Sequence, residues 1–201
     1  MKLKHAAWLI ASVLLTPDLT RAADKGLGGP VAPGSSANWE LKGIALGTTQ
    51  EDFKAKFPEA QCYSDDDRRS ECVDLNVTVL DRKAALRAHY LDGKAVYVGF
   101  ERLRQDQMVL AGRALKTKFG QASHEYFVDA TVHRGAEGVQ RIRIEYLAWL
   151  DGDVLMDTNA ENWLDKKVDY TCGQVKIINV PKVREWDTLS EKKSNPAVRD
   201  I

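Results

Sequence analysis

Two short stretches that resemble each other decide the predicted fold: FKAKFPEA at residues 53–60 and LKTKFGQA at residues 115–122. Each places two large apolar residues four positions apart, so that both lie on one face of a helix. Lysines occupy the last turn of each stretch, where positive charge stabilises the helix dipole. A helix breaker then follows, Pro58 in the first and Gly120 in the second. We therefore predict two helices that end in the same way.

The two predicted helices begin differently. Thr48 and Glu51 have the spacing of a capping box, in which each side chain accepts a hydrogen bond from the other residue's backbone. The second helix is longer, and Gly112 in its interior weakens it slightly. Its apolar stripe is formed by Met108, Ala111, Leu115 and Phe119.

A second pair of similar segments supports a repeat. YLDG at residues 90–93 and WLDG at residues 149–152 each interrupt an alternating, strand-like pattern. Each fits a three-residue hairpin loop that ends in glycine. One such hairpin follows each predicted helix. The sequence thus predicts an α+β fold of two tandem units, each a helix followed by antiparallel strands, which together form one curved sheet with helices on one face.

Alternation also predicts which strand residues share a face. Superposing the two LDG turns places Tyr90 level with Trp149, yet the surrounding patterns disagree about which face is the core. Either one turn has a different register, or both faces near the hairpins are partly apolar. One predicted stripe contains Val73, Leu75, Val77 and Val79, and another contains Ile142, Ile144, Tyr146 and Ala148.

The first 22 residues have the pattern of a bacterial signal peptide. Basic MKLK precedes the apolar run AAWLIASVLL, and the small residues Ala22 and Ala23 offer a cleavage site. The run is too short for a membrane span, which takes ~20 residues. We predict a periplasmic or secreted protein with no membrane span or lipid anchor. The expected segments are a signal peptide (1–22), a flexible linker (23–38), a first unit (39–103), a second unit with an extra strand (104–180) and a charged tail (181–201).

Charge and motifs exclude several kinds of function. The chain carries 29 basic and 29 acidic residues, so it gives no electrostatic reason to bind nucleic acid. No phosphate-binding, dinucleotide-binding or zinc-ligand spacing is found, and no catalytic, cofactor or metal residue is predicted. The acidic run 65–67 is interpreted as a solvated loop, because it lacks the spacing of a calcium loop.

The three cysteines are interpreted in the light of export. In an oxidising compartment two of them are expected to pair, and three cysteines allow three single bridges. We favour Cys62–Cys72, because the two flank a hydrophilic, loop-like segment. Cys172 then remains either as a small buried residue in a strand or as a reactive thiol.

GIALGTTQEDF at residues 43–53, FPEAQC at residues 57–62 and Cys72 together resemble the opening unit of beta-lactamase inhibitor protein-like domains. The related small lipoproteins of outer-membrane assembly use one such unit. The resemblance covers about residues 40–158. It implies two units in tandem, a curved antiparallel sheet and helices on its convex side. The second unit here lacks the GTT signature and a cysteine pair of its own.

Two classes of function follow. The first is a non-enzymatic, inhibitor- or adaptor-like protein that binds another exported or envelope protein. The second is a small periplasmic enzyme that uses Cys172 or a histidine–carboxylate pair. Arginine and tryptophan are enriched at interface hot spots, and the predicted contact residues are Arg87, His89, Tyr97, Arg143, Leu147 and Trp149. The alternative is that Trp149 is covered by the C-terminal segment, through Val183, Trp186 or Leu189.

Overall fold

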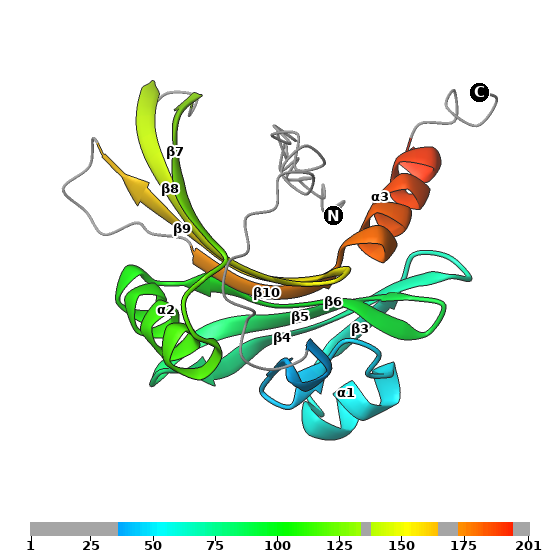
Figure 1. Ribbon diagram of the computed structural model, residues 1–201. Coiled ribbons are helices and arrows are strands. Elements are labelled where there is room, and N and C mark those ends of the chain that lie inside the picture. The colour runs from blue at the N-terminus through cyan, green and yellow to red at the C-terminus, as the bar shows by residue number, and fades with distance from the viewer. Residues whose placement is uncertain (1–35, 134–137, 165–172, 195–201) are drawn as a thin grey trace, which may run out of the picture. The chain divides into compact units, whose positions relative to one another are not determined.

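Eight strands form one antiparallel sheet in the order β3-β4-β5-β6-β10-β9-β8-β7 (Figure 1). The computed structural model describes residues 36–133, 138–164 and 173–194. The strands of this sheet are β3 (Gln61–Ser64), β4 (Arg69–Val79), β5 (Arg82–Leu91), β6 (Lys94–Leu103), β7 (His124–His133), β8 (Val139–Asp151), β9 (Val154–Trp163) and β10 (Gly173–Asn179). A separate small hairpin pairs β1 (Glu40–Leu41) with β2 (Ile44–Ala45). The helices are α1 (Gln50–Lys56), α2 (Gln105–Phe119) and α3 (Val180–Ser194), and a short 3₁₀ turn, η2, spans Ser36–Asn38.

The prediction of two tandem helix-and-strand units is wrong. β10, expected as an extra strand of the second unit, lies in the middle of the sheet and pairs with both β6 and β9. The strands therefore form a single continuous sheet. The helices also do not share one face, because α1 and α2 lie below the sheet in Figure 1 and α3 lies above it. The fold agrees with the prediction only as a broad mixture of helices and antiparallel strands.

The main core lies on the face covered by α1 and α2, which we call the helix face. Phe53 of α1 is fully buried there, and Met108 and Phe119 of α2 are nearly so. The ring of Trp39 packs edge-on against that of Phe119, with centroids 5.9 Å apart. The sheet contributes the largest part of this core, through Leu86, Ala88, Tyr90, Val98, Leu103, Trp149, Met156, Val175 and Ile177.

The predicted helix ends are confirmed, whereas the predicted N-cap is off by one residue. α1 ends at Lys56 and α2 at Phe119, just before Gly120, which has φ 81°. The N-cap of α1 is Thr49, whose hydroxyl accepts a hydrogen bond from the backbone N–H of Asp52 at 3.2 Å. The hydroxyl of Thr48 instead accepts a hydrogen bond from the backbone N–H of Ala45 in β2, at 3.2 Å.

Both LDG hairpins have two-residue loops rather than the predicted three. In the first, Leu91 pairs with Lys94 across Asp92 and Gly93, which have φ 52° and 76°. Two consecutive left-handed residues match the twist of the flanking strands, and this favours glycine and aspartate. In the second hairpin, the residue after the leucine, Asp151, is itself paired. The second loop is therefore displaced by one residue along the sequence.

This displacement decides between the two alternatives that the sequence left open. Because the turns differ in register, Tyr90 and Trp149 both face the core, and both are fully buried. The β-bulge between β5 and β6 places its extra residue, Val96, on β6, so Tyr90 keeps the face of Leu86 and Ala88.

The predicted stripe of valines on β4 is interrupted. Val73 pairs with Arg87, and Val77 pairs with Ala84, with a register shift between Asp74 and Val77. A bulge re-aims the side chains beyond it, so Val73 and Val77 lie on opposite faces of the sheet. The stripe from Ile142 to Ala148 on β8 is uninterrupted.

Cys62 and Cys72 form the predicted pair. They lie directly opposite each other in β3 and β4, with their sulfur atoms 1.94 Å apart. Cys172 lies outside the described residues.

Removing this bridge is expected to destabilise the fold moderately. Closing a loop of this length restricts the unfolded chain, so replacing both Cys62 and Cys72 with serine should lower the free energy of unfolding by about 2–3 kcal/mol. Urea denaturation followed by circular dichroism measures the change. Reduction of the parent protein should reproduce it, and an unchanged midpoint would contradict the prediction.

Candidate functional site

The six predicted contact residues lie on two faces of the sheet. Arg143, Leu147 and Trp149 alternate along β8 on the helix face, where Leu147 and Trp149 pair with Thr158 and Met156 of β9. The other three lie opposite, on the face that carries α3, which we call the α3 face; they are Arg87, His89 and Tyr97. The structure therefore does not bring the six together into one surface.

Trp149 is not exposed, contrary to the prediction. Its side chain is fully buried, and its indole N–H donates a hydrogen bond to the carbonyl of Gly120 at 3.1 Å. Its exposure was expected on the face opposite the Ile142–Ala148 stripe, but α1 and α2 cover that face. Trp149 thus packs in the core near the end of α2. The segment that covers it is not the C-terminal one.

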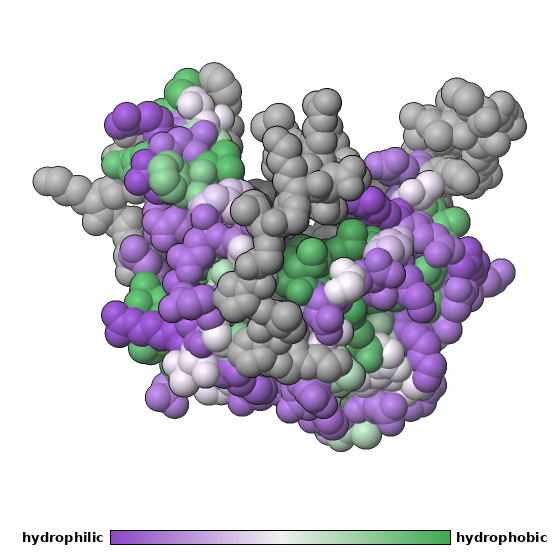
Figure 2. Space-filling view, in the orientation of Figure 1, coloured by the Kyte–Doolittle hydropathy of each residue, from purple (hydrophilic) through white to green (hydrophobic). Residues whose placement is uncertain are grey.

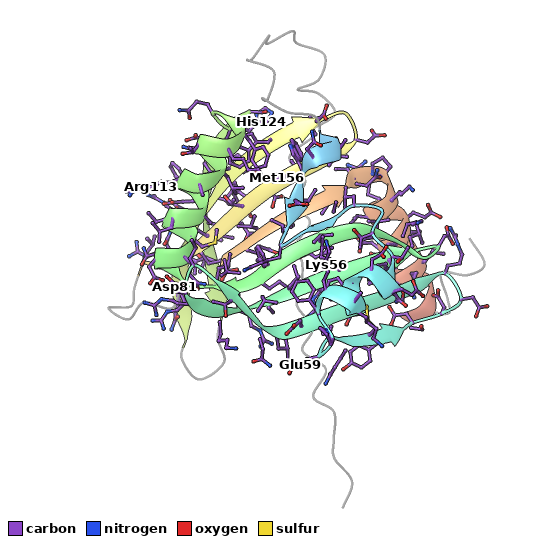
Figure 3. All side chains as sticks on the ribbon, turned by 90° about the horizontal axis from the view of Figure 1, so that it is seen from below. Lys56, Glu59, Asp81, Arg113, His124 and Met156 are labelled. Carbon is purple, nitrogen blue, oxygen red and sulfur yellow. A yellow bond between two sulfur atoms is a disulfide. The ribbon has the colours of Figure 1, made fainter. Side chains whose placement is uncertain are left out.

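A groove on the helix face lies between α2 and strands β8 and β9. Its volume is about 570 Å³, within the range of small-molecule pockets. Figure 3 shows α2 in front of the sheet, with Arg113 projecting from the helix. The groove is lined by Gln105, Met108, Val109, Gly112, Arg113 and Lys116 of α2, by Glu125 of β7, by Arg143, Glu145 and Leu147 of β8, by Thr158, Ala160 and Asn162 of β9, and by Leu164.

Contacts hold α2 over the sheet at both ends of the groove. Near the start of α2, the amide of Gln105 donates to the side chain of Asn162 at 3.4 Å. Near its end, Lys116 forms an ion pair with Glu125 at 2.5 Å. Between them, a methyl group at Gly112 would lie 3.2 Å from the side chain of Leu147. The interior glycine of α2 therefore permits the helix to approach β8 closely.

Arg143 is held in one orientation at the rim of the groove. Its guanidinium donates two hydrogen bonds to the carboxylate of Asp129 on β7, at 2.7 and 2.9 Å. The same group lies over the ring of Phe127, 4.3 Å from its centroid. The hydrogen bond from Arg143 lowers the pKa of Asp129 below its ordinary value. An ordered arginine beside an exposed aromatic ring is typical of interface hot spots.

Exposed apolar residues surround this groove. Phe127, Val109 and Leu164 are about half exposed. Figure 2 shows apolar residues among polar ones where Figure 1 places the projecting ends of β7 and β8. Alternation did not single out Phe127 and Val109, because a single apolar residue on a mostly polar face carries no periodic signal.

The α3 face carries a polar cluster on β4, β5 and β6. Arg87 donates to Glu71 at 2.8 Å and to Glu101 at 3.0 Å, and Tyr97 donates to Glu101 at 3.4 Å. Nε2 of His89 lies 3.7 Å from the carboxylate of Glu71. Three of the predicted contact residues are thus neighbours, but they contact one another and adjacent carboxylates.

His89 is stacked between two aromatic rings. Tyr97 lies against one side, with centroids 4.6 Å apart, and Trp186 of α3 lies at 4.5 Å. Burial, together with the positive charge of Arg87, lowers the pKa of His89 to about 4. The imidazole is therefore neutral near pH 7. The stacked rings of Tyr97 and Trp186 hold the plane of the imidazole in one orientation.

The C-terminal segment docks onto this cluster as α3. The buried guanidinium of Arg69 lies 5.2 Å from the ring centroid of Trp186 and donates to the carboxylate of Asp66 at 2.7 Å. Arg68 bridges Asp92, in the β5–β6 turn, and Glu185 of α3. Residues 181–194 of the expected charged tail thus belong to a helix, and Trp186 of this helix packs on the face opposite Trp149.

No metal site is formed in the described part of the chain. Among residues 36–133, 138–164 and 173–194, no group of three or more His, Cys, Asp or Glu residues could hold a metal ion. In the acidic run, Asp66 accepts hydrogen bonds from Arg69, which lower the pKa of its carboxyl group.

Comparisons with protein-family models, with curated protein sequences and with solved structures found no match. None of the described helices is both long and apolar enough to cross a membrane. Any assignment of function therefore rests on the sequence and on the geometry described above.

Proposed function

We propose that this protein is an exported, non-enzymatic binding protein of the inhibitor or adaptor type, and that the groove beside α2 is where it contacts another exported or envelope protein. The observation that carries the proposal is the groove itself, with ordered Arg143 and exposed Phe127, Val109 and Leu164 around it. Periplasmic or secreted localisation is part of the proposal, and it is supported by the signal-peptide pattern of residues 1–22.

The charges of the groove indicate how such a partner is recognised. Lys116 is paired with Glu125, and Arg143 is paired with Asp129. Binding therefore does not depend on a large net charge in the partner. Apolar contact with exposed side chains and hydrogen bonds from arginine are the interactions that this groove offers.

The alternative, a small enzyme, receives less support. Its histidine–carboxylate pair exists as His89 and Glu71, but the histidine is stacked between two aromatic rings and its pKa is lowered to about 4. A general base is most effective with a pKa near the working pH.

Substitutions in the groove are expected to weaken partner binding. The double variant Val109→Glu and Arg143→Ala places a carboxylate in the groove and removes the ordered cation. Recovery of the partner from the organism's own periplasmic extract should fall at least about tenfold, since hot-spot losses typically exceed ~1.4 kcal/mol.

Leu110→Glu is the matched control. Leu110 is the next residue of α2 and is 48% exposed, against 49% for Val109, but it does not line the groove. It should leave recovery unchanged, and circular dichroism should show that both variants are folded. Full recovery with the double variant would rule out this groove as the contact surface.

A further inference from the structure

β7 is a long edge strand with one neighbour. Its ten residues pair with β8 without any register shift, and among the described residues no other strand pairs with it. The backbone N–H and C=O groups on its outer side therefore have no strand partner in the described part of the chain. Such a row of groups is a template for another strand.

The two edges of the sheet differ in how they are protected. Proteins protect edge strands by making them short, by bulges, or with lysine and proline. The opposite edge strand, β3, has four residues and is bridged to β4 by the disulfide. β7, with the sequence HEYFVDATVH, contains no lysine, arginine or proline. Three consecutive apolar residues of β7 are also well exposed, namely Tyr126 (46%), Phe127 (59%) and Val128 (41%).

We propose that β7 pairs antiparallel with β7 of a second copy of this chain, about a two-fold axis through Val128, so that the two sheets become continuous. In an antiparallel pair, residues that lie opposite each other point to the same face of the sheet. A two-fold axis between identical strands must therefore pass beside one residue, which then lies opposite its own copy. The symmetric interface is then self-complementary, as the common dimers are. Pairing extends from His124 to Val132 of each copy.

Charge selects this register from its neighbours. An axis through Phe127 places Glu125 opposite Asp129, and an axis through Asp129 places that carboxylate opposite itself. Like charges directly opposite each other destabilise a strand pair. An axis through Val128 brings valine to valine and Tyr126 to Ala130, with no like charges opposed. Registers centred nearer either end of β7 leave fewer residues paired.

The charges on β7 also suit a second copy better than a partner recognised by charge. Asp129 is held by Arg143 at 2.7 Å, and Glu125 is held by Lys116 at 2.5 Å. The two carboxylates of the strand are thus compensated within their own chain. They therefore offer no unpaired charge to a basic strand, and in the Val128 register they do not lie opposite each other.

The first test is the molar mass in solution. Light scattering over about 1–100 µM, a range that spans micromolar dissociation constants, should show the mass rising from one chain to two. Val128→Lys places two ammonium groups opposite each other, so it should raise the dissociation constant about tenfold or more. Val128 is exposed, so the variant is expected to fold, and circular dichroism verifies this. If the parent protein stays at the mass of one chain throughout this range, the proposal is overturned. This holds even if another molecule is later found to pair with β7.

The second test fixes the register by crosslinking. In a Cys172→Ser background, Val128→Cys places one free thiol opposite its own copy, and oxidation with diamide should yield a covalent dimer. Tyr126→Cys is the matched control, since residue 126 lies on the same face with similar exposure but faces Ala130 of the other copy. Equal crosslinking of the two variants would overturn the proposed axis. Val109→Glu should leave the dimer intact, so this result is distinguishable from failure of the groove proposal.

Discussion

Replacing Trp149 with alanine lowers the free energy of unfolding by about 3–5 kcal/mol, the range for removing a large aromatic side chain from a core. The indole is fully buried on the helix face among Met156, Phe119 and other residues of the main core. Alanine leaves a cavity there, and it also leaves the carbonyl of Gly120 without the hydrogen bond that it accepts from the indole. Urea denaturation followed by far-UV circular dichroism measures the loss without relying on tryptophan fluorescence.

The neighbouring residue supplies the control. Leu150 follows Trp149 on β8, points to the other face and is about half exposed. Leu150→Ala should change the free energy of unfolding by no more than about 0.5 kcal/mol, as is usual for surface positions. If the two substitutions have equal effects, Trp149 is not the core residue described here.

Acidification from pH 7 to pH 4 destabilises the fold by about 3 kcal/mol through His89 alone. The pKa of this imidazole is about 4 in the folded protein, against an ordinary value of 6.5. Between those two values the unfolded chain binds the proton and the folded chain does not. The free energy of unfolding therefore falls as the pH falls through this window. Above pH 6.5 the imidazole is neutral in both states, and His89 does not lower the stability.

Other groups near the cluster titrate with different signs or in a different range. Hydrogen bonds from arginines lower the pKa of Asp66 and Asp92, so their contributions are lost mainly at more acidic pH. Burial raises the pKa of Asp157 on the same face, against the opposing effect of Lys176. That carboxyl gains its proton more readily in the folded chain, so it opposes the effect of His89 as the pH falls.

The His89 contribution is isolated by substitution. His89→Phe retains a ring between Tyr97 and Trp186 but cannot titrate, so its free energy of unfolding should change less between pH 7 and pH 4 than that of the parent. Leu150→Ala, at an exposed position that carries no titratable group, should leave the pH profile of the parent unchanged. Parallel profiles for the parent and His89→Phe would show that His89 does not carry the effect.

Local features of the fold could be predicted from the sequence. The ends of α1 and α2 were predicted correctly, because breakers and lysines act within one turn of the helix. The Cys62–Cys72 bridge was also predicted, because both cysteines flank one short polar segment. The stripe from Ile142 to Ala148 was predicted as well, because unbroken alternation is a property of a single strand.

The arrangement of the sheet could not be predicted in the same way. Alternation shows which residues share a face, but it does not show which face receives the helices when both contain apolar residues. Trp149 and Ile142 lie on opposite faces of β8, and both are buried. Similarly, no local pattern shows that β10 inserts beside β6 instead of extending the second meander.

The candidate site shows the same limit. Arg143 and Leu147 were predicted as contact residues and both line the groove, but the groove also depends on α2, whose position over β8 is a tertiary property. Arg87 and His89 were assigned to the same surface because the β-bulges and turn registers that separate them from Arg143 have no clear sequence signal.

The pairing of β6 with β10 has a consequence for the kinetics of folding. It joins Phe100 to Val175, whereas the other ladders of the sheet connect strands that follow one another in the chain. The meanders β3–β6 and β7–β9 can therefore form through local contacts, while β10 must close a long loop before it gains any contact with β6. Until that closure, β6 is an open edge that exposes apolar residues such as Val98 and Phe100, so the nascent chain is most prone to misassociation just before its C-terminal strand arrives.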